Sequence, residues 1–333
     1  MEISVVVPVR NEESSIRNLL EGLLSQTLRP NEIVITDGGS NDETTKIIEQ
    51  FVRDGAPVRL IREQQALPGR GRNRGAERAN NQWIAFTDAG NKPAPQWLAA
   101  LAQQVDDNPS VDVVFGSYEP VIDSFFKECA AIAYVPPPFE TEEGTWIRPR
   151  FIASSLMRRK VWEAVGGFRE TLRSGEDLLF MRNIDRKNFH IVRAPKAVVH
   201  WEIQPNLWRT FRRFVTYARN NIRAGLWREW QAAVLLRYGL IGLTIAPAVF
   251  FGWRYLALPL LLWLLMLVAR AGRALRRNRH AYPATHARNL ARLFLLVPII
   301  AALDVAALLG SLNWLLLDKF SFGTSRNEYA TSR

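Results

Sequence analysis

The sequence has one cysteine, Cys129, among 333 residues. A single thiol excludes an intrachain disulfide and a cysteine-rich metal site, and we interpret it as a small buried apolar residue. The sequence also has no internal repeat and no low-complexity tract. No signal peptide precedes the first predicted strand, which begins at Ile3. We therefore expect the N-terminal domain to stay on the cytosolic side.

Acidic residues are too few to balance the basic ones: 32 Asp and Glu stand against 43 Lys and Arg, a formal charge of +11. Such an excess can indicate nucleic-acid binding, which would need basic residues interleaved with stacking aromatics over a soluble surface. Here the arginines concentrate at 210–228 and 270–292, beside strongly apolar stretches. This pattern is typical of a membrane protein with a basic cytoplasmic face, and we expect no nucleic-acid partner.

Long apolar runs are absent from the first 230 residues but fill the region 231–318, where we predict about three transmembrane helices. The middle run is 15 residues long, about 22 Å of helix, against a hydrocarbon core of about 30 Å. Runs this long make buried helices of a soluble domain a poor alternative. The three runs are Ala232–Trp253, Tyr255–Ala269 and Leu293–Leu317.

Only Arg254 separates the first two runs, which predicts a tight hairpin. A single broken span would put the arginine-rich loop 270–292 outside, against the positive-inside rule. We therefore expect a multi-pass protein of the inner (cytoplasmic) membrane, with a cytosolic catalytic domain and a short polar tail, 319–333, on the other side. The segment 203–230 is predicted to be an amphipathic helix on the membrane surface.

The N-terminal region, predicted to form a domain over 1–202, alternates strands with helices. Apolar residues at i, i+3, i+4, i+7 and i+8 from Ile16 mark one face of a helix. Near-continuous apolar strands predict a mostly parallel sheet covered by helices on both faces, which is an α/β fold.

Polar residues follow three of these strands. Asp37 ends the run that begins at Glu32, Arg10-Asn11-Glu12 follows Ile3–Val9, and Asp88 follows Trp83–Thr87. Ligands bind at the carboxyl ends of strands in open α/β sheets. Acidic groups gathered there suit the base and ribose of a nucleotide and a metal that bridges its diphosphate.

Four motifs in order carry a family resemblance: VVVPVRNE, DGGSNDET, PGRGRNRGAERA and TDAG, with Gly175-Glu176-Asp177 further on. They resemble the inverting glycosyltransferases with the GT-A fold, the dolichol-phosphate-sugar-synthase-like enzymes, over roughly residues 1–220. The resemblance implies a GT-A nucleotide-diphospho-sugar transferase fold. It also implies a nucleotide-sugar donor and a membrane-associated, lipid-linked acceptor.

The resemblance further implies a donor-binding set. Asp37 would hydrogen-bond the base or ribose, although it could instead only cap its turn. The helix start near Gly69 favours an anion. Its sequence departs from the family pattern Ala-Arg-Asn-x-Gly, because Gly71 replaces the alanine. The expected donor-binding residues are Pro8, Arg10, Glu12, Asp37, Gly69, Arg72, Asn73 and Asp88.

The metal motif is incomplete. Family members usually show Asp-x-Asp or Asp-x-Asp-Asp, and this chain reads Asp88-Ala89-Gly90-Asn91. Mg²⁺ often needs only one or two carboxylates besides phosphate oxygens and waters, so we still expect Mg²⁺ or Mn²⁺ at Asp88. His200 is a further possible ligand, with a purely structural histidine as the alternative.

Glu176-Asp177 matches the acidic pair of the family. Inversion needs one base on the acceptor side, and we expect Asp177 to be that base with Glu176 beside it. The alternative is that both carboxylates only compensate the dipole at a helix N-terminus. The Gln-x-x-Arg-Trp of processive synthases is absent, which disfavours polymerisation.

We therefore interpret the chain as a membrane-anchored inverting glycosyltransferase that transfers one sugar in polysaccharide or glycolipid synthesis at the cell envelope. The main alternative is a catalytically impaired, glycosyltransferase-like binding protein, because the later carboxylates are missing. A nucleotidyltransferase would need a glycine-rich phosphate loop after the first strand, where Arg10-Asn11-Glu12-Glu13 stands instead. A transport or scaffold protein would need more spans.

Overall fold

The computed structural model describes residues 1–142 and 144–320. The chain forms two compact units. Unit 1 contains Met1–Ile122 and Pro136–Ile203, and unit 2 contains Asp123–Val135 and the chain from Gln204 onward. The sequence analysis placed 123–135 in the first domain, whereas the structure gives this segment to unit 2. Most of the predicted polar tail, 321–333, lies outside the described residues.

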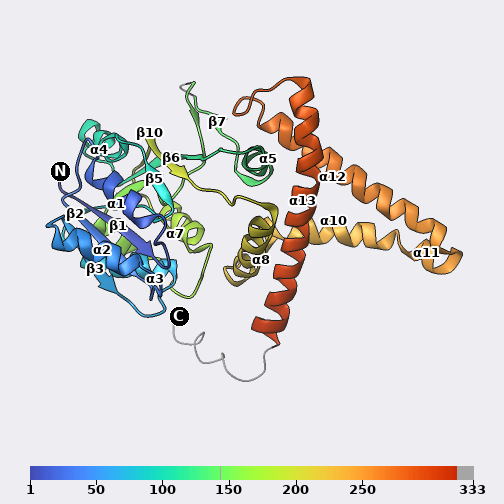
Figure 1. Ribbon diagram of the computed structural model, residues 1–333, viewed down its shortest axis with the longest axis horizontal. Helices are drawn as coiled ribbons and strands as arrows, with labels where there is room; N and C mark the ends of the chain where they lie inside the picture. The colour runs from blue at the N-terminus through green and yellow to red at the C-terminus, as the bar shows by residue number, and fades with distance from the viewer. Residues whose placement is uncertain (143, 321–333) are drawn as a thin grey trace. The chain divides into compact units, whose positions relative to one another are not determined.

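Unit 1 is built on an eight-stranded sheet of order β3-β2-β1-β4-β9-β6-β10-β5 (Figure 1). β1, β2, β3 and β4 run parallel to one another. β9 lies antiparallel between β4 and β6, β10 pairs parallel with β6, and β5 forms an antiparallel edge. The mostly parallel α/β sheet predicted from the sequence is therefore confirmed. The strands are β1 Ile3–Val9, β2 Glu32–Asp37, β3 Val58–Arg62, β4 Trp83–Phe86, β5 Asn91–Pro93, β6 Val113–Pro120, β9 Ser155–Arg158 and β10 Ile191–Trp201, with a separate pair β7 Phe139–Glu140 and β8 Trp146–Ile147.

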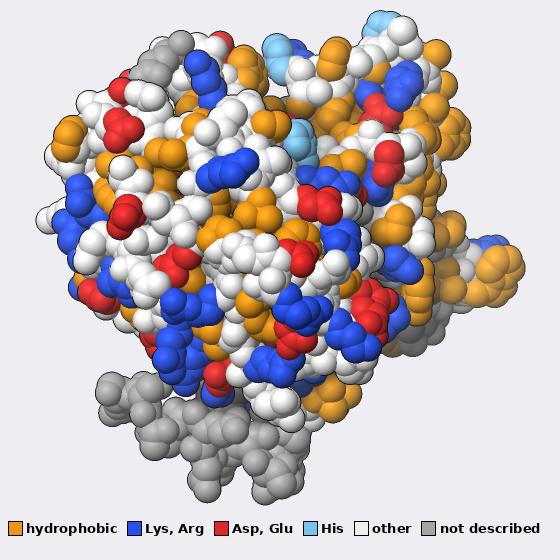
Figure 2. All heavy atoms as spheres, turned by 60° about the vertical axis from the view of Figure 1, so that its left-hand side comes forward, with side chains coloured by type: hydrophobic (Ala, Val, Ile, Leu, Met, Phe, Trp, Pro, Cys, Tyr) orange, Lys and Arg blue, Asp and Glu red, His pale blue; other side chains and the backbone are white. Residues whose placement is uncertain are grey.

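Helices cover this sheet and bury their apolar faces against it. The first helix buries Ile16, Leu19, Leu20 and Leu23, the face that the sequence period predicts. The core includes Val6, Val34, Phe86 and Phe115 from four strands, packed against Phe168 and Phe180. Acidic and basic side chains are interspersed over the face of unit 1 in Figure 2. The helices are α1 Ile16–Leu24, α2 Thr44–Arg53, α3 Pro68–Arg78, α4 Trp97–Asp107, α6 Arg159–Ala164 and α7 Glu176–Asp185.

Glycines let α3 approach β1 closely. A Cβ atom at Gly75 would lie 2.4 Å from Val6 Cγ1, and one at Gly71 would lie 2.9 Å from the Cβ of Pro8. Both distances are shorter than carbon atoms of neighbouring side chains can approach, so a side chain at either glycine would push α3 and β1 apart. The glycine at position 71, where the family pattern has alanine, thus has a packing reason. It brings the start of α3 against the end of β1.

Unit 2 is helical. Its helices are α5 Phe125–Tyr134, α8 Leu207–Arg223, α9 Trp227–Trp230, α10 Ala232–Leu243, α11 Ala246–Phe251, α12 Ala257–Arg277 and α13 His286–Trp314, with a 3₁₀ turn η1 at Trp253–Leu256 and a π-helical turn η2 at Leu315–Lys319. Among the residues that the structure describes, two helical stretches are long and apolar enough to cross a membrane, Trp253–Arg277 and His286–Lys319.

The first predicted span is not one helix. It divides into α10 and α11 around Thr244 and Ile245, and Ala232–Ala248 counts only as a shorter apolar helix. The turn at Arg254 is present, where Gly252 adopts a φ of 103° and joins α11 to η1. We call α10, α11, η1 and α12 the apolar hairpin, which projects from α13 in Figure 1. Its tip is exposed, with Trp253 81% accessible.

The third predicted span, Leu293–Leu317, covers most of α13 and the first part of η2, and α8 and α5 pack against α13. A Cβ at Gly310 would lie 2.5 Å from the Cβ of Ala218 in α8, and Arg219 of α8 donates to Asp318 at 2.8 and 2.9 Å. The N-terminal part of α13 packs on α5 through apolar side chains that include Cys129. His286–Lys319 is one of the described stretches that are long and apolar enough to cross a membrane, and 33% of its apolar window is buried. The third span therefore stays a prediction, although α8 and α5 contact part of α13.

Candidate functional site

The polar strand ends meet at one edge of the sheet in unit 1. In the parallel register Val9 lies opposite Asp37, and Asp37 lies opposite Arg62. β4 runs parallel to β1, so Asp88, which follows it, emerges at the same edge. The structure therefore confirms that the polar residues after these strands gather at one edge of the sheet.

Asp37 is buried and engaged by its own turn. Its carboxylate accepts hydrogen bonds from the backbone N–H of Gly39 at 3.1 Å and of Ser40 at 3.2 Å, and from the Ser40 hydroxyl. Gly38 allows this tight turn, because a Cβ there would lie 2.5 Å from the carbonyl oxygen of Ala66. The structure thus shows Asp37 capping its own turn, which is the alternative stated above. Donor binding by Asp37 stays a prediction, and it would require the carboxylate oxygens to bind the turn and the donor at once.

The loops after β1 and β2 are bonded to each other. Asn11, at a φ of 56°, accepts at its side-chain oxygen from the backbone N–H of Asn41 at 2.9 Å. The backbone N–H of Glu12 donates to the hydroxyl of Thr44 at 2.7 Å. Arg10 is exposed, while Pro8 is half-buried. The sequence analysis did not single out Asn11, although Asn is the residue type that most readily adopts a left-handed backbone.

Arg72 of α3 is the centre of the site. Its buried guanidinium donates from Nη2 to Asp88 at 2.6 Å and from Nη1 to Glu176 at 2.8 Å. The guanidinium also lies 5.4 Å from the centre of the Phe168 ring. Burial lowers the pKa of Arg72, but the nearby carboxylates of Asp88, Glu176 and Asp177 raise it by more. The guanidinium group therefore stays charged. One arginine thus bridges the ends of β4 and α7.

Glu176 and Asp177 begin α7, after Gly175 at a φ of 85°. Burial, then the charge of Asp177, raises the pKa of Glu176 to about 7 against the opposing effect of Arg72. Burial also raises the pKa of Asp177. Glu176 is buried, and among the described residues its Oε2 has no hydrogen-bond partner. Asp177 is partly exposed and accepts from the N–H of Leu178 at 2.8 Å.

Asn73 and Gly69 connect α3 to the loop that leads to this acidic pair. The Asn73 amide donates to the Phe168 carbonyl at 2.8 Å and to Glu170 at 3.0 Å, and its oxygen accepts from the Phe168 N–H at 2.8 Å. It also accepts from the indole of Trp162 at 3.1 Å. A Cβ at Gly69 would lie 2.3 Å from the carbonyl oxygen of Arg169. In the structure both residues hold this loop, and their contribution to donor binding stays a prediction.

Asp88 is the carboxylate that fits a divalent metal. Arg72 holds one of its oxygens, and its side chain is still 36% accessible. Orienting a ligand carboxylate by a neighbouring donor is common at metal sites. A Cβ at Gly90 would meet no atom within 4 Å, so the space beside Asp88 is open. Asn91, in contrast, is buried in β5.

His200 is exposed on β10, opposite Lys92 of β5. Within residues 1–142 and 144–320, no three His, Cys, Asp or Glu side chains are placed to hold a metal together. An ion at Asp88 would therefore need oxygens from the donor diphosphate and water. The contribution of His200 stays a prediction.

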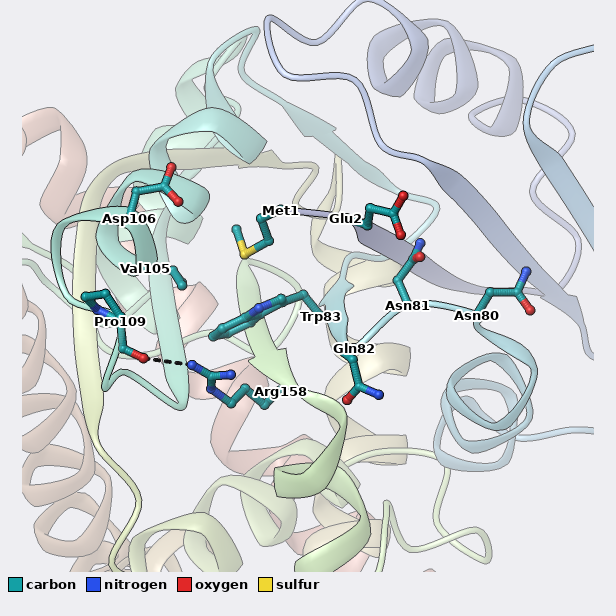
Figure 3. A pocket seen from close by; sticks show the side chains of 10 residues that line it. All are labelled: Met1, Glu2, Asn80, Asn81, Gln82, Trp83, Val105, Asp106, Pro109 and Arg158. Carbon is teal, nitrogen blue, oxygen red and sulfur yellow. Dashed lines mark hydrogen bonds between the residues drawn. The ribbon is translucent and has the colours of Figure 1, made fainter.

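A separate cavity of about 580 Å³ lies at the amino ends of β1 and β4 (Figure 3). Its lining includes Met1, Glu2 and Trp83, and Arg158, which donates to the carbonyl of Pro109 at 2.7 Å. This is the edge opposite to the one that carries Asp37 and Asp88. The cavity therefore does not coincide with the acidic site.

The mostly parallel sheet, the acidic strand ends and the Glu-Asp pair at the start of α7 define a glycosyltransferase of the GT-A fold. Residues 4–170 match the model of the family "Glycosyl transferase family 2". This match covers half of the chain, and the protein belongs to glycosyl transferase family 2.

Curated relatives agree with this family. The chain is 33% identical over 100 residues to the uncharacterized glycosyltransferase YibD of Escherichia coli, covering 30% of this chain and 29% of that protein. It is 27% identical over 187 residues to an uncharacterized glycosyltransferase of Haemophilus influenzae, covering 54% and 60%. The matched segments thus span less than two thirds of either relative.

One solved structure supports the fold. The mannosyltransferase PcManGT from Pyrobaculum calidifontis, in complex with GDP-Man and Mn²⁺, has a TM-score of 0.54 and 19% identity, covering 96% of this chain and 88% of that one. At this identity the likeness establishes the fold alone.

Proposed function

We propose that this chain is an inverting glycosyltransferase that moves one sugar from a nucleotide-sugar donor to a membrane-associated, lipid-linked acceptor. The observation that carries the proposal is the Arg72 bridge, which holds Asp88 and Glu176 at the strand edge where family members bind their donor. The complex of PcManGT with GDP-Man and Mn²⁺ supports a donor of this class.

Asp177 is the proposed base. It is partly exposed, whereas Glu176 is buried, so an acceptor hydroxyl has access to Asp177. In an inverting displacement that hydroxyl attacks the anomeric carbon while the bond to the diphosphate breaks, and its proton passes to the base. Burial raises the pKa of Asp177, which makes its carboxylate a stronger base than an exposed one. Glu176 and Arg72 fix the position of α7 and the charge around it.

The donor side combines Asp88 with the loops after β1 and β2. Asp88 would hold Mg²⁺ or Mn²⁺ together with the donor diphosphate, and the ion would offset the charge of the leaving group. Pro8, Arg10, Glu12 and Asp37 are the proposed neighbours of the base and ribose. Gly69 and Asn73 contribute by shaping the loop behind Arg72.

The apolar hairpin is the proposed membrane anchor. Trp253 and Tyr255 flank Arg254 at its exposed tip, an arrangement typical of a membrane–water interface. We propose that the hairpin crosses the inner membrane and returns, while α13 and its partners α5 and α8 stay on the cytosolic side with the catalytic domain. The alternative predicted from the sequence is that His286–Lys319, which is long and apolar enough, forms a further crossing.

Purified protein should be screened against a panel of nucleotide sugars for hydrolysis and for transfer to lipid phosphates and glycolipids. One donor should support transfer with inversion at the anomeric carbon, and a retained configuration would contradict the mechanism. Tight donor binding without turnover on any acceptor or water would favour the alternative, a catalytically impaired binding protein.

Topology can be tested by labelling in intact cells. Burial raises the pKa of the only thiol, Cys129, to about 11, so the unmodified chain should not react. A membrane-impermeant maleimide should label Arg254→Cys from outside and miss Arg277→Cys until the membrane is opened. Labelling of Arg277→Cys from outside would overturn the proposed orientation.

A further inference from the structure

A buried charge cluster joins the base of the apolar hairpin to α13. Asp304 of α13 is 2% accessible and accepts from Arg270 of α12 and from the hydroxyl of Tyr238 of α10 at 3.1 Å. Arg237 of α10 lies 3.8 Å from the other carboxylate oxygen. The indole of Trp263 donates to the Tyr238 hydroxyl at 3.1 Å. Both oxygens of Asp304 therefore face cationic groups.

The cluster has one positive charge too many. Arg237 and Arg270 share the single carboxylate of Asp304, and the surface beside them is apolar, with Leu236 and Leu240 exposed on α10. A charge without a counter-ion is costly at an apolar surface. One arginine would be enough to link the helices through Asp304. The second arginine has no carboxylate of its own, and an anion would balance its charge.

The two arginines are also accessible to that anion. Their side chains remain 32% and 22% exposed, for Arg237 and Arg270 respectively, whereas Asp304 is enclosed. The Nε atom of Arg237 is buried and has no hydrogen-bond partner among the described residues. Guanidinium groups are the side chains best suited to phosphate, because their planar donors can bind two oxygens at once.

The position along the hairpin fits a lipid headgroup. From Arg270 to the start of α12 the helix is about 20 Å long, and α10 and α11 run a similar length beyond Arg237. If Trp253 and Tyr255 at the tip lie at the far interface, the cluster lies about 10 Å inside the opposite boundary of a core about 30 Å thick. Arginine side chains reach lipid phosphates from such a depth by snorkelling.

We propose that Arg237 and Arg270 form a binding site for the phosphate group of an anionic membrane lipid, with Asp304 holding the two guanidinium groups in place. This inference rests on the membrane attachment proposed above. The bound lipid would supply the missing negative charge and fix the depth of the hairpin.

The chain contains a matched control. Glu128 of α5 is also shared by two arginines, Arg288 and Arg292, with Arg292 Nε donating to it at 3.0 Å. Arg288 is 55% exposed, and Phe125 lies beside it. Removing Arg288 therefore deletes the same kind of surplus charge at a place where water already solvates it.

The test uses the full chain in detergent micelles, with phosphatidylglycerol or phosphatidylcholine titrated in and retained lipid counted by native mass spectrometry. Wild type and Arg288→Gln should prefer phosphatidylglycerol. Arg237→Gln should lose roughly tenfold in phosphatidylglycerol affinity, as expected for one charge-assisted hydrogen bond, and lose less for phosphatidylcholine, whose choline offsets the phosphate charge. Arg237→Lys should retain most of the preference, and unchanged melting temperatures would show that the variants are folded.

Equal lipid binding by Arg237→Gln and Arg288→Gln would overturn the site. Inorganic phosphate that binds as tightly as phosphatidylglycerol would overturn its assignment to a lipid. Flotation with vesicles separates the two proposals: a chain that floats with neither lipid contradicts membrane attachment and the site together, whereas equal flotation of wild type and Arg237→Gln with unequal lipid retention supports the site alone.

Discussion

Each unit of this protein contains a buried charge cluster, and the two clusters are unbalanced in opposite directions. In unit 1 one guanidinium group, that of Arg72, forms ion pairs with the carboxylates of Asp88 and Glu176, and Asp177 lies next to them. In unit 2 two guanidinium groups, Arg237 and Arg270, share the one carboxylate of Asp304.

The sign of each imbalance indicates what the cluster can bind. Surplus carboxylates in a buried place raise each other's pKa and favour protons or metal ions. Surplus guanidinium groups stay charged and favour an anion. Unit 1 is thus suited to proton transfer and a metal-bound diphosphate, and unit 2 to a phosphate at the membrane surface. On the two proposals made above, the same residue types would support two different functions because the ratio of carboxylates to guanidinium groups differs.

The largest effect should come from removing the base of the unit 1 cluster. Asp177→Asn keeps the shape of the side chain but cannot accept the acceptor proton, and loss of a general base typically lowers the rate by about 10²–10⁴. Donor binding should stay within a few-fold, because the proposed role of Asp177 is on the acceptor side. Steady-state transfer rates and calorimetry with the nucleoside diphosphate give the two readouts.

Asp304→Asn is the matching change in unit 2, and it should leave the chemical step intact. Near-normal turnover by Asp177→Asn would remove Asp177 from the mechanism and return the acidic pair to a role at the helix N-terminus.

Asp88→Ala should have the next largest effect, on the order of 10² in rate, because it removes the proposed metal ligand and with it much of the stabilisation of the leaving diphosphate. Activity of the unmodified enzyme should require Mg²⁺ or Mn²⁺, and the metal should bind appreciably only when donor is present. Full activity in excess chelator would show that arginine alone neutralises the leaving group.

Sequence patterns could predict the sheet and the strand-end acids, because apolar period and turn residues are local signals. Arg72 could be predicted as a site residue, but not as a bridge, because Glu176 is 104 positions away along the chain. The role of Asn73 could not be predicted either, since its four hydrogen bonds depend on a loop folded back from residues 162–170. For the same reason an apolar run such as 293–317 predicts burial but does not identify what covers it.

The pH dependence of the transfer rate should reflect the excess of carboxylates over guanidinium groups in the unit 1 cluster. The base, Asp177, must be ionised, and burial raises its pKa. Burial and the charge of Asp177 also raise the pKa of the neighbouring Glu176 to about 7. Transfer should therefore fall as the pH drops below neutrality, by at most about tenfold per pH unit, and level off at higher pH. The acid limb belongs to the coupled pair, and Glu176→Gln should move it to lower pH by removing a neighbouring charge. A flat profile from pH 5 to 8 would contradict this account.

Stability should change in the opposite direction over the same range. The folded-state pKa of Glu176 lies above its usual 4.5, so the folded protein binds more protons than the unfolded chain. Its contribution to stability is present below about 4.5 and is lost as the pH rises to about 7. Melting temperatures of wild type and Glu176→Gln over this window check the sign.

The smallest expected effect comes from adding a carboxylate to the unit 1 cluster. Gly90→Asp restores an acid where the family motif has one, and open space surrounds the position of the new Cβ. A second hard, charged oxygen beside Asp88 should lower the metal concentration that gives half-maximal activity by a few-fold, with little change in the maximal rate. Gly90→Asn has nearly the same size without the charge and should leave the metal response as in wild type. If both variants respond alike, the missing charge at position 90 does not limit metal affinity, and the carboxylate surplus of unit 1 already suffices for the ion.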